Sequence, residues 1–282
     1  MRTIDLHVHT GASDSTCSPA EVVRLAAETG LSAIAITDHD TAAGYPAAAE
    51  AGAALGVEVV PGIEISTRYF GAVHILGYFI DPDSPELRPV LDWVVQDRDE
   101  RNLKMVELMA ADGLQVSYDQ MRERFGEVVG RPHFAQILVE LGMAKDVPDA
   151  FARFVEKGQK YYVGRHFLSI ERSVEIIRLA GGVPVLAHPF QYRLDDAKLR
   201  ELIEHYMESG LQGMECLYTG YSAEQSEYLL ALAKEYGLQP TGGSDFHGAN
   251  KPHIQLGRGT GELRVPYEYL EKLKELKSHG SL

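Results

Sequence analysis

The chain has 282 residues, of which 27 are Lys or Arg and 41 are Asp or Glu, so its formal net charge at pH 7 is −14. Hydrophobic residues make up 45% and charged residues 24%, a globular composition that excludes a disordered chain. No apolar run reaches the ~18 residues of a membrane span, the two cysteines are too few for a disulfide framework, and the acidic charge excludes a basic module that binds duplex DNA.

Short strands and helices alternate over the first eighty residues. The pattern predicts strands over residues 4–9, 31–37, 57–65 and 72–79, and helices over residues 19–29 and 42–55. The first helix has a clear amino-terminal signal, because Ser18 can cap it, Pro19 fits its first position and Glu21 lies three residues after the cap. Such alternation favours a parallel sheet.

The same alternation returns in the last part of the chain. The pattern there predicts helices over residues 170–180, 195–209, 222–236 and 267–277, and strands over residues 183–187, 213–217 and 238–242. Together with the first part this makes about seven strands. We therefore expect an α/β fold with a parallel β/α barrel that is closed or nearly closed.

Residues 82–166 interrupt this alternation. Apolar side chains recur there at helical spacing, as in the series Phe134, Ile137, Leu138 and Leu141, and no convincing strand pattern occurs. We therefore expect residues 1–81 and 167–282 to form the barrel. Residues 82–166 are expected to form an inserted helical subdomain that contributes to the substrate pocket.

Histidines and carboxylates gather at the predicted carboxyl ends of strands, where β/α enzymes build their sites. The motifs are Asp5-Leu6-His7-Val8-His9, Thr37-Asp38-His39-Asp40, Gly62-Ile63-Glu64, Val73-His74, Ala187-His188-Pro189 and Ser244-Asp245-Phe246-His247. The two imidazoles of the first motif are two residues apart and share one face of a strand. Burying so many imidazoles and carboxylates together is costly unless cations pair with them. A ligand set without thiolates suits Mn²⁺, Zn²⁺ or Fe²⁺, so the sequence predicts a metal centre.

Taken in order, these motifs resemble those of the PHP (polymerase and histidinol phosphatase) family, and the resemblance spans the chain. The inserted helical region makes the chain most similar to the stand-alone bacterial members, which include 3′,5′-nucleoside bisphosphate phosphatases that also trim RNA from its 5′ end. The resemblance implies a distorted seven-stranded β/α barrel with three divalent metal ions. Mn²⁺ is the first expectation for these ions, and Zn²⁺ or Fe²⁺ are the alternatives.

The resemblance also implies the ligands. One ion would be held by His7, His9, Glu64 and Asp245, a second by Glu64, His74 and His188, and a third by Asp14, His39 and His247. Many family members have histidine where this chain has Asp14, and a carboxylate favours a harder ion. Asp5 and Asp38 are expected to orient neighbouring ligands. Asp40 is a ligand, an orienting group or the N-cap of the helix over residues 42–55. It is only a weak catalytic candidate, because the expected nucleophile is a hydroxide between two metals.

A candidate anion site lies at the start of a helix in the insertion. In Gly130-Arg131-Pro132-His133, free backbone N–H groups, a guanidinium and an imidazole meet at one helix end. A solvated helix start is the plainer interpretation. Lys160 and Arg165 are further candidates for binding the substrate, although cations in a loop are usually just solvated.

These features favour a metal-dependent phosphoesterase acting on nucleotides. The expected reaction is removal of the 3′-phosphate from nucleoside 3′,5′-bisphosphates, with 5′-to-3′ trimming of short oligonucleotides as a related activity. The alternatives are a phosphomonoesterase for a small metabolite such as histidinol phosphate, a catalytically silent metal-binding module, and an amidohydrolase on a similar barrel. The expected partner is a small phosphorylated substrate, not duplex DNA or a membrane. The amino end lacks the apolar stretch of a signal peptide, and the cysteines are few, which predicts a cytoplasmic location.

Overall fold

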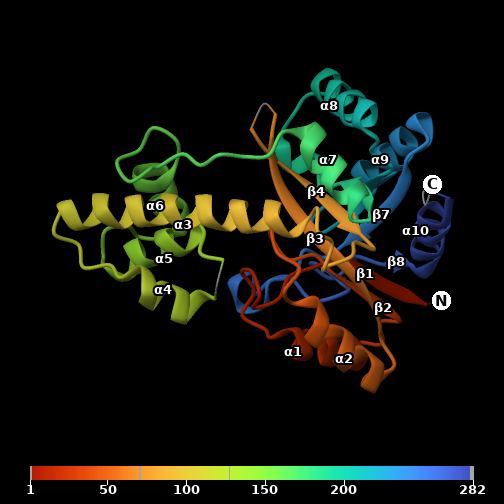
Figure 1. Ribbon diagram of the computed structural model, residues 1–282, viewed down its shortest axis with the longest axis horizontal. Helices are drawn as coiled ribbons and strands as arrows, with labels where there is room; N and C mark the ends of the chain where they lie inside the picture. Colours follow the sequence, from red (N-terminus) through yellow and green to blue (C-terminus); the bar gives the residue numbers. More distant parts are fainter. Residues whose placement is uncertain (1, 70, 127, 280–282) are drawn as a thin grey trace. The chain divides into compact units, whose positions relative to one another are not determined.

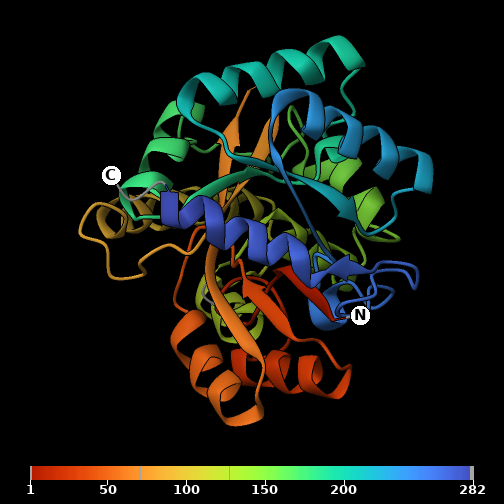
Figure 2. The ribbon, with the colours of Figure 1, turned by 90° about the vertical axis from the view of Figure 1, so that its right-hand side faces the viewer.

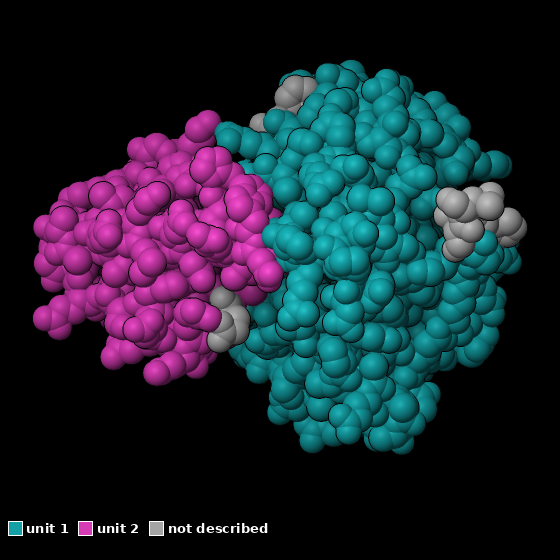
Figure 3. Space-filling view, in the orientation of Figure 1, with its two compact units in different colours: residues 1–90, 167–282 teal, residues 91–166 magenta. Residues whose placement is uncertain are grey.

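The computed structural model describes residues 2–69, 71–126 and 128–279 (Figure 1). The chain divides into two compact units, which Figure 3 colours separately. Unit 1 comprises residues 1–90 and 167–282, and unit 2 comprises residues 91–166. The sequence predicts that the insertion starts at residue 82, whereas unit 2 begins inside the helix α3 (Arg88–Ala111).

Unit 1 contains a sheet that is nearly closed into a barrel (Figure 2). Its strands are β1 (Thr3–Val8), β2 (Ala33–Ile36), β3 (Glu58–Arg68), β4 (Ala72–Tyr78), β5 (Val183–Leu186), β6 (Gly213–Tyr218), β7 (Gln239–Gly243) and β8 (Val265–Pro266). Among the described residues they follow the order β7-β6-β5-β4-β3-β2-β1-β8. The predicted α/β barrel class is confirmed. The strand β8 was not expected, because two residues show no periodicity in a sequence.

The sheet is parallel except at β4 and β8. β4 runs antiparallel to both of its neighbours, β3 and β5, and β8 runs antiparallel to β1. The prediction of a parallel sheet is therefore wrong for β4. Only three positions of the chain separate β3 from β4, and the two strands form a hairpin because a parallel crossover needs a longer connection. The hairpin extends β3 to Arg68, so that Glu64 lies within this strand instead of at its end.

Backbone hydrogen bonds join the end of β1 to the segment that follows β7. The backbone N–H of Asp245 donates to the carbonyl of His7 at 2.9 Å, and that of His9 donates to the carbonyl of Phe246 at 3.0 Å. Val8 and Phe246 form an isolated parallel bridge. These bonds place the first and last predicted ligand motifs side by side, although they are separated by most of the chain.

Helices cover the strands of unit 1 (Figure 2). They are α1 (Pro19–Glu28), α2 (Tyr45–Leu55), α7 (Ile170–Leu179), α8 (Asp196–Ser209), α9 (Ala223–Tyr236) and α10 (Tyr267–His279), with short 3₁₀ turns at Pro189–Tyr192 and Gly248–Asn250. The capping box of α1 is confirmed, because Ser18 accepts from the backbone of Glu21 and Glu21 accepts from that of Ser18. Ile4, Leu76 and Leu270 belong to one buried apolar cluster, which packs α10 onto the sheet.

Unit 2 is helical and has its own apolar core. Its elements are the rest of α3, α4 (Tyr118–Phe125), α5 (Arg131–Glu140), α6 (Val147–Ala150) and a π-helical turn at Phe151–Val155. Met105, Phe134, Leu138 and Tyr161 are buried in this core, as the helical spacing of Phe134 and Leu138 predicted. In the described part of the chain, no helix combines the length and apolar character needed to cross a membrane. The cytoplasmic location stays a prediction.

Candidate metal centre

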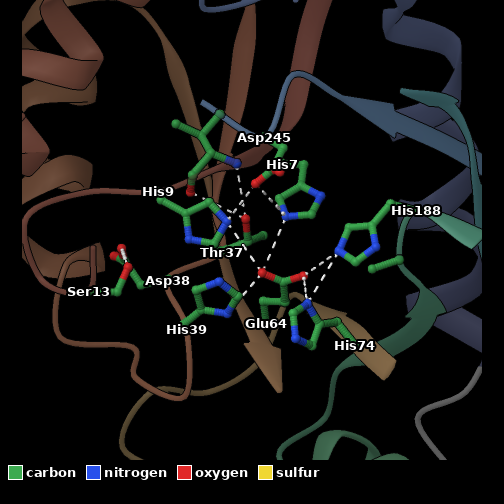
Figure 4. Close-up of polar contacts among 12 residues, drawn as sticks. His7, His9, Ser13, Thr37, Asp38, His39, Glu64, His74, His188 and Asp245 are labelled. Carbon is green, nitrogen blue, oxygen red and sulfur yellow. Dashed lines mark hydrogen bonds and ion pairs between the residues drawn. The ribbon is translucent and has the colours of Figure 1, made fainter. Parts of the chain in front are cut away.

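The nine side chains predicted as metal ligands all belong to unit 1, and the fold brings them together. Figure 4 labels all of them except Asp14 and His247. His7, Glu64 and His74 lie on β1, β3 and β4, while His9, Asp14, His39, His188, Asp245 and His247 lie in segments that follow β1, β2, β5 and β7. Three ligands thus lie on strands of one sheet, and the other six lie in segments that follow its strands. Strand pairing fixes where these segments begin.

One group of ligand atoms surrounds Oε2 of Glu64 and Oδ1 of Asp245. Nε2 of His9 lies 3.3 Å from the first oxygen and 3.2 Å from the second. Nε2 of His7 lies 3.4 and 3.6 Å from the same two atoms. Four ligand atoms from three parts of the chain therefore converge on one point.

A second group of ligand atoms surrounds Oε1, the other carboxylate oxygen of Glu64. Nδ1 of His74 and Nε2 of His188 each lie 3.0 Å from Oε1 of Glu64, and these two nitrogens are 3.3 Å apart. Glu64 therefore faces two groups with its two oxygens. That is the geometry of a carboxylate that bridges two cations.

A third group is centred on Asp14. Its Oδ1 lies 3.3 Å from Nε2 of His247 and 3.6 Å from Nδ1 of His9, and its Oδ2 lies 3.9 Å from Nε2 of His39. Nδ1 of His39 is in turn 3.0 Å from Oε2 of Glu64, which joins this group to the first. Ligand atoms of His9, Asp14, His39 and His247 can be chosen that all lie within 4.8 Å of one another.

The donor set fits divalent cations. An ion with bonds of about 2.1 Å holds its ligand atoms roughly 3.0–3.5 Å apart. Most of the separations above fall in this range, and the longest is the 3.9 Å between Asp14 and His39. Nε2 of His7 and both ring nitrogens of His9 are buried without a hydrogen-bond partner among the described residues. Buried polar atoms normally find a partner, and a cation would supply one here. The nine side chains together carry only imidazole and carboxylate groups, as Mn²⁺, Zn²⁺ and Fe²⁺ accept.

The charges in the site shift the pKa values of its histidines. Burial opposes a positive charge on His7, yet the carboxylates around it, Glu215 first, hold its pKa well above the ordinary value. Burial also opposes the charge on His9, but the neighbouring carboxylates of Asp245 and Glu64 raise the pKa of His9 to about 9. Without ions, protons compensate the carboxylates, so binding of a cation has to displace them.

Two of the ligands have strained backbones. His188 has a φ of +27° and Asp245 a φ of +57°, a region that residues with a side chain rarely adopt. Each follows a strand closely, β5 and β7 respectively. Strain of this kind persists only where the surrounding structure enforces it, and it is concentrated at functional sites. Here it turns both side chains toward the other ligands (Figure 4).

Glu215 was missed by the sequence analysis. It is fully buried on β6, accepts from Nδ1 of His7 at 3.0 Å, and accepts from the backbone N–H of His188 at 2.8 Å. It therefore fixes the ring of one predicted ligand and the backbone of another, the usual arrangement of a carboxylate behind a metal-binding histidine. A charged residue in the apolar strand Gly213–Tyr218 was the available signal.

Tyr218 and Lys251 support Asp245. The Tyr218 hydroxyl and the Lys251 ammonium each donate to Oδ2 of Asp245 at 2.6 Å, which leaves Oδ1 directed at the histidines. The negative carboxylates raise the pKa of Lys251 although burial opposes this, so its charge is retained. Nothing in the sequence around Lys251 pointed to this role.

The three other aspartates of the motifs have distinct contacts. Asp5 accepts from the hydroxyl and backbone N–H of Ser244 and from the N–H of Gly257, so it ties β1 to the segments after β7. Asp38 accepts from Thr10 and Ser13 and thereby orders the segment that carries Asp14. Asp40 accepts from the backbone N–H of Ser66 on β3 at 2.9 Å. Its interpretation as a helix cap is wrong, because the N-cap of α2 is Gly44.

The four predicted substrate-binding residues all belong to unit 2. Nδ1 of His133 accepts from the backbone N–H of Gly130 at 3.0 Å, and its ring stacks on Phe125, so this histidine also has a structural role. Lys160 forms an exposed ion pair with Asp112.

Arg131 and Arg165 join two arginines on α3 that the sequence analysis did not select, Arg98 and Arg101. Both are more than nine-tenths buried, and Nε of Arg101 has no hydrogen-bond partner among the described residues. Burial, followed by the charges of Arg165, Arg98 and Arg131, lowers the pKa of Arg101 to about 9. We call these four residues the arginine cluster. Arg98 and Arg101 are three residues apart on the face of α3 that also buries Val94 and Met105. This spacing was the signal that the sequence analysis missed.

Comparisons with known proteins agree with this geometry. The model of the PHP domain family matches residues 5–213. A 5′-3′ exoribonuclease of Haemophilus influenzae is 34% identical over 86% of this chain and 89% of its own length. A 3′,5′-nucleoside bisphosphate phosphatase of Chromobacterium violaceum is 34% identical over 91% of both chains. A solved structure of a proposed metal-dependent phosphoesterase from Bifidobacterium adolescentis superposes with a TM-score of 0.83 at 33% identity, covering 96% of this chain and 95% of that one.

Proposed function

The chain belongs to the PHP domain family of metal-dependent phosphoesterases, and we propose that it removes the 3′-phosphate of nucleoside 3′,5′-bisphosphates and trims short oligonucleotides from the 5′ end. Relatives that each match most of the chain carry these two activities in their names. One mode of binding accounts for both. The substrate in each case has a 5′-phosphate and, one nucleoside further on, the phosphate whose bond to O3′ is broken.

The reacting phosphate belongs at the nine converged ligands. We assign His7, His9, Glu64 and Asp245 to one divalent ion, Glu64, His74 and His188 to a second, and Asp14, His39 and His247 to a third, with Mn²⁺ as the expected metal. Bound ions of this kind lower the pKa of a water molecule and stabilise the charge on phosphoryl oxygens. Glu215 keeps the ring of His7 oriented, and Lys251 adds a fixed positive charge beside Asp245.

The arginine cluster is the observation that supports a second phosphate. Burial, and after it the charges of Arg165, Arg98 and Arg131, lowers the pKa of Arg101, and a dianionic phosphate beside Arg101 would stabilise its charge. Arginine also binds phosphate oxygens through two parallel hydrogen bonds. We assign the 5′-phosphate to this cluster, with Arg131 at the amino-terminal end of α5 contributing backbone N–H groups as well.

The test compares adenosine 3′,5′-bisphosphate with adenosine 3′-monophosphate on the Mn²⁺-loaded protein. The substitution Arg101→Met places an unbranched, uncharged side chain in the buried position. We expect KM for the bisphosphate to rise by about 10- to 100-fold, since a hydrogen bond to a charged group contributes roughly 1.5–3 kcal/mol. The kinetics of the monophosphate should stay unchanged.

Arg153→Met is the matched control, because Arg153 also belongs to unit 2 but forms an exposed pair with Asp149. It should leave both substrates unaffected. Equal turnover of the bisphosphate and the monophosphate by the wild-type protein would contradict the proposed second phosphate and favour a simple phosphomonoesterase. Absence of turnover with all ions bound would contradict the phosphoesterase assignment itself.

A further inference from the structure

A cavity of about 430 Å³ lies between the amino-terminal turns of α8 and α9 in unit 1. Phe190, Leu194, Leu199 and Tyr228 form its apolar walls, and Gln225 lies at its edge. None of these residues has a role in the metal centre described above. The volume falls within the range of cavities that bind small organic groups.

The cavity opens at the same end of the barrel as the metal centre. In units where a helix follows a parallel strand, the amino-terminal turn of the helix lies near the carboxyl end of that strand, and α8 and α9 follow β5 and β6. Phe190 also lies only two residues after the predicted ligand His188. A short stretch of backbone therefore connects one wall of the cavity to the predicted ligand His188.

A continuous series of rings leads from His188 to the cavity. The ring of His188 lies 5.5 Å from that of Tyr218, which lies 5.1 Å from that of Tyr221. The ring of Phe190 lies 5.4 Å from that of Tyr221 and 5.9 Å from that of Tyr228. These centroid distances are typical of interacting aromatic side chains. The series is a chain of packed rings that connects the metal centre to the wall of the cavity.

The charges around the cavity disfavour a phosphate there. Asp196 and Glu224 lie at its edge, and the nearby Arg200 is already bound to Asp196 and Glu235. Asp196 is bound by Arg200 and by the hydroxyl of Tyr228, whereas the carboxylate of Glu224 repels an anion and can accept hydrogen bonds from ring or exocyclic amino groups. The chemistry of the cavity therefore matches an uncharged, flat, nitrogen-containing ring.

We propose that this cavity binds the base of the nucleotide that follows the scissile phosphate in an oligonucleotide. The inference rests on the proposed function and extends it. In the trimming reaction water adds its oxygen to phosphorus, the bond from phosphorus to O3′ breaks, and O3′ takes up a proton as the 5′-terminal nucleotide leaves. The phosphate stays on the next nucleoside, whose base then needs a binding place. A nucleoside bisphosphate has no such nucleoside and leaves the cavity empty.

The test measures kcat/KM for three substrates on the Mn²⁺-loaded protein. They are adenosine 3′,5′-bisphosphate, a 5′-phosphorylated diadenosine dinucleotide, and the same dinucleotide without its second base. Tyr228→Ala should lower kcat/KM for the complete dinucleotide by about ten-fold, the order of magnitude that base stacking on an aromatic ring contributes. It should leave the bisphosphate and the dinucleotide lacking the second base unchanged.

Tyr236→Ala provides a matched control. Tyr228 and Tyr236 both lie on α9, and each donates its hydroxyl to a carboxylate of α8, Asp196 and Glu204 respectively. Only Tyr228 lines the cavity, so Tyr236→Ala should not discriminate between the substrates. Tyr228→Phe keeps the ring and should retain most of the activity on the dinucleotide. Filling the cavity by Leu194→Trp should reproduce the selective loss without removing the tyrosine.

A spectroscopic measurement separates binding from turnover. With 2-aminopurine as the second base, its fluorescence should be quenched on binding to the metal-free wild-type protein and recover in Tyr228→Ala. Equal kcat/KM ratios in wild type, Tyr228→Ala and Leu194→Trp, with no change in quenching, would overturn the proposed base site while the phosphoesterase assignment stands. Failure of the wild-type protein to hydrolyse any of the three substrates would overturn the proposed function and this inference with it.

Discussion

At the scale of single residues, Glu215 shows how much of the metal site depends on groups that bind no metal. Its two oxygens hold the His7 ring and the backbone N–H of His188, and both contacts are buried. His7 also supplies a nitrogen to the group of ligand atoms around Oε2 of Glu64 and Oδ1 of Asp245. When ions are absent, Glu215 has the largest effect among the carboxylates that raise the pKa of His7. When an ion is bound, the same charge makes the imidazole a stronger donor.

Replacing Glu215→Gln should therefore weaken the binding of metal without unfolding the protein. The amide oxygen can still accept from His7, but the negative charge is lost. We expect metal affinity to fall by about 10- to 100-fold, which is the usual effect of removing such a partner. A titration of Mn²⁺ against a competing chelator measures this directly.

A Glu204→Gln variant controls for the loss of one negative charge, because Glu204 is exposed on α8 and accepts from the hydroxyl of Tyr236, away from the predicted ligands. Its metal affinity should equal that of the wild type. If Glu215→Gln also bound Mn²⁺ as tightly as the wild type, the role assigned to Glu215 would be incorrect.

At the scale of the elements, the approach of β7 to β1 brings the motif of Asp245 beside that of His7. The approach is close because Gly243, the last residue of β7, has no side chain. A Cβ on Gly243 would lie 2.8 Å from Cα of His7 and closer still to its N and Cβ atoms. Two strands cannot separate here without moving two predicted ligands.

Gly243→Ala should consequently destabilise the barrel and impair metal binding together. Inserting a methyl group into such a packed contact costs about 1–3 kcal/mol of unfolding free energy. Gly71→Ala is the matched control, because a Cβ on Gly71 would meet no atom within 4 Å. Chemical denaturation and metal analysis of both variants test this. A Gly243→Ala protein with wild-type stability and full metal content would show that β1 and β7 can separate freely.

The elements that the sequence predicts are those whose signals are local. The capping box of α1 and the spacing of Phe134 and Leu138 depend only on neighbouring residues, and both agree with the structure. The antiparallel course of β4 depends on a pairing with β5, more than a hundred residues away in the chain. Glu215 is separated from its partner His7 by 208 positions. Long-range pairing of this kind leaves no periodic pattern in a sequence.

The nine proposed ligands were selected from the imidazole and carboxylate motifs and from their resemblance to the PHP family, and the structure brings these side chains together. Their role as ligands stays a prediction. The arginine cluster was only half selected, since Arg131 and Arg165 stand in conspicuous loop or helix-start positions. Arg98 and Arg101 lie inside a long helix, where arginine is an ordinary surface residue.

At the scale of the whole molecule, we expect bound metal ions to stabilise the two units to different extents. The nine proposed ligands come from strands throughout unit 1, and unit 2 contributes none of these nine. Unit 2 instead has its own apolar core around Met105 and Phe134. An ion that binds the folded form but not the unfolded one stabilises the part of the protein that must unfold before the ion is released. The ions should therefore stabilise unit 1 selectively.

Chelation followed by hydrogen exchange tests this difference residue by residue. Removing the ions leaves the carboxylates of Glu64, Asp14 and Asp245 compensated by protonated histidines and by Lys251 alone, so local opening of the segments that hold these ligands becomes easier. We expect backbone amides of β1 and β7 to exchange at least about ten-fold faster after chelation, which corresponds to roughly 1.4 kcal/mol. Amides in the middle of α5 should keep their rates, and adding Mn²⁺ should restore protection in unit 1. Equal acceleration in both units would mean that they open as one cooperative body, and unchanged rates in β1 and β7 would mean that the ions contribute nothing to holding the barrel together.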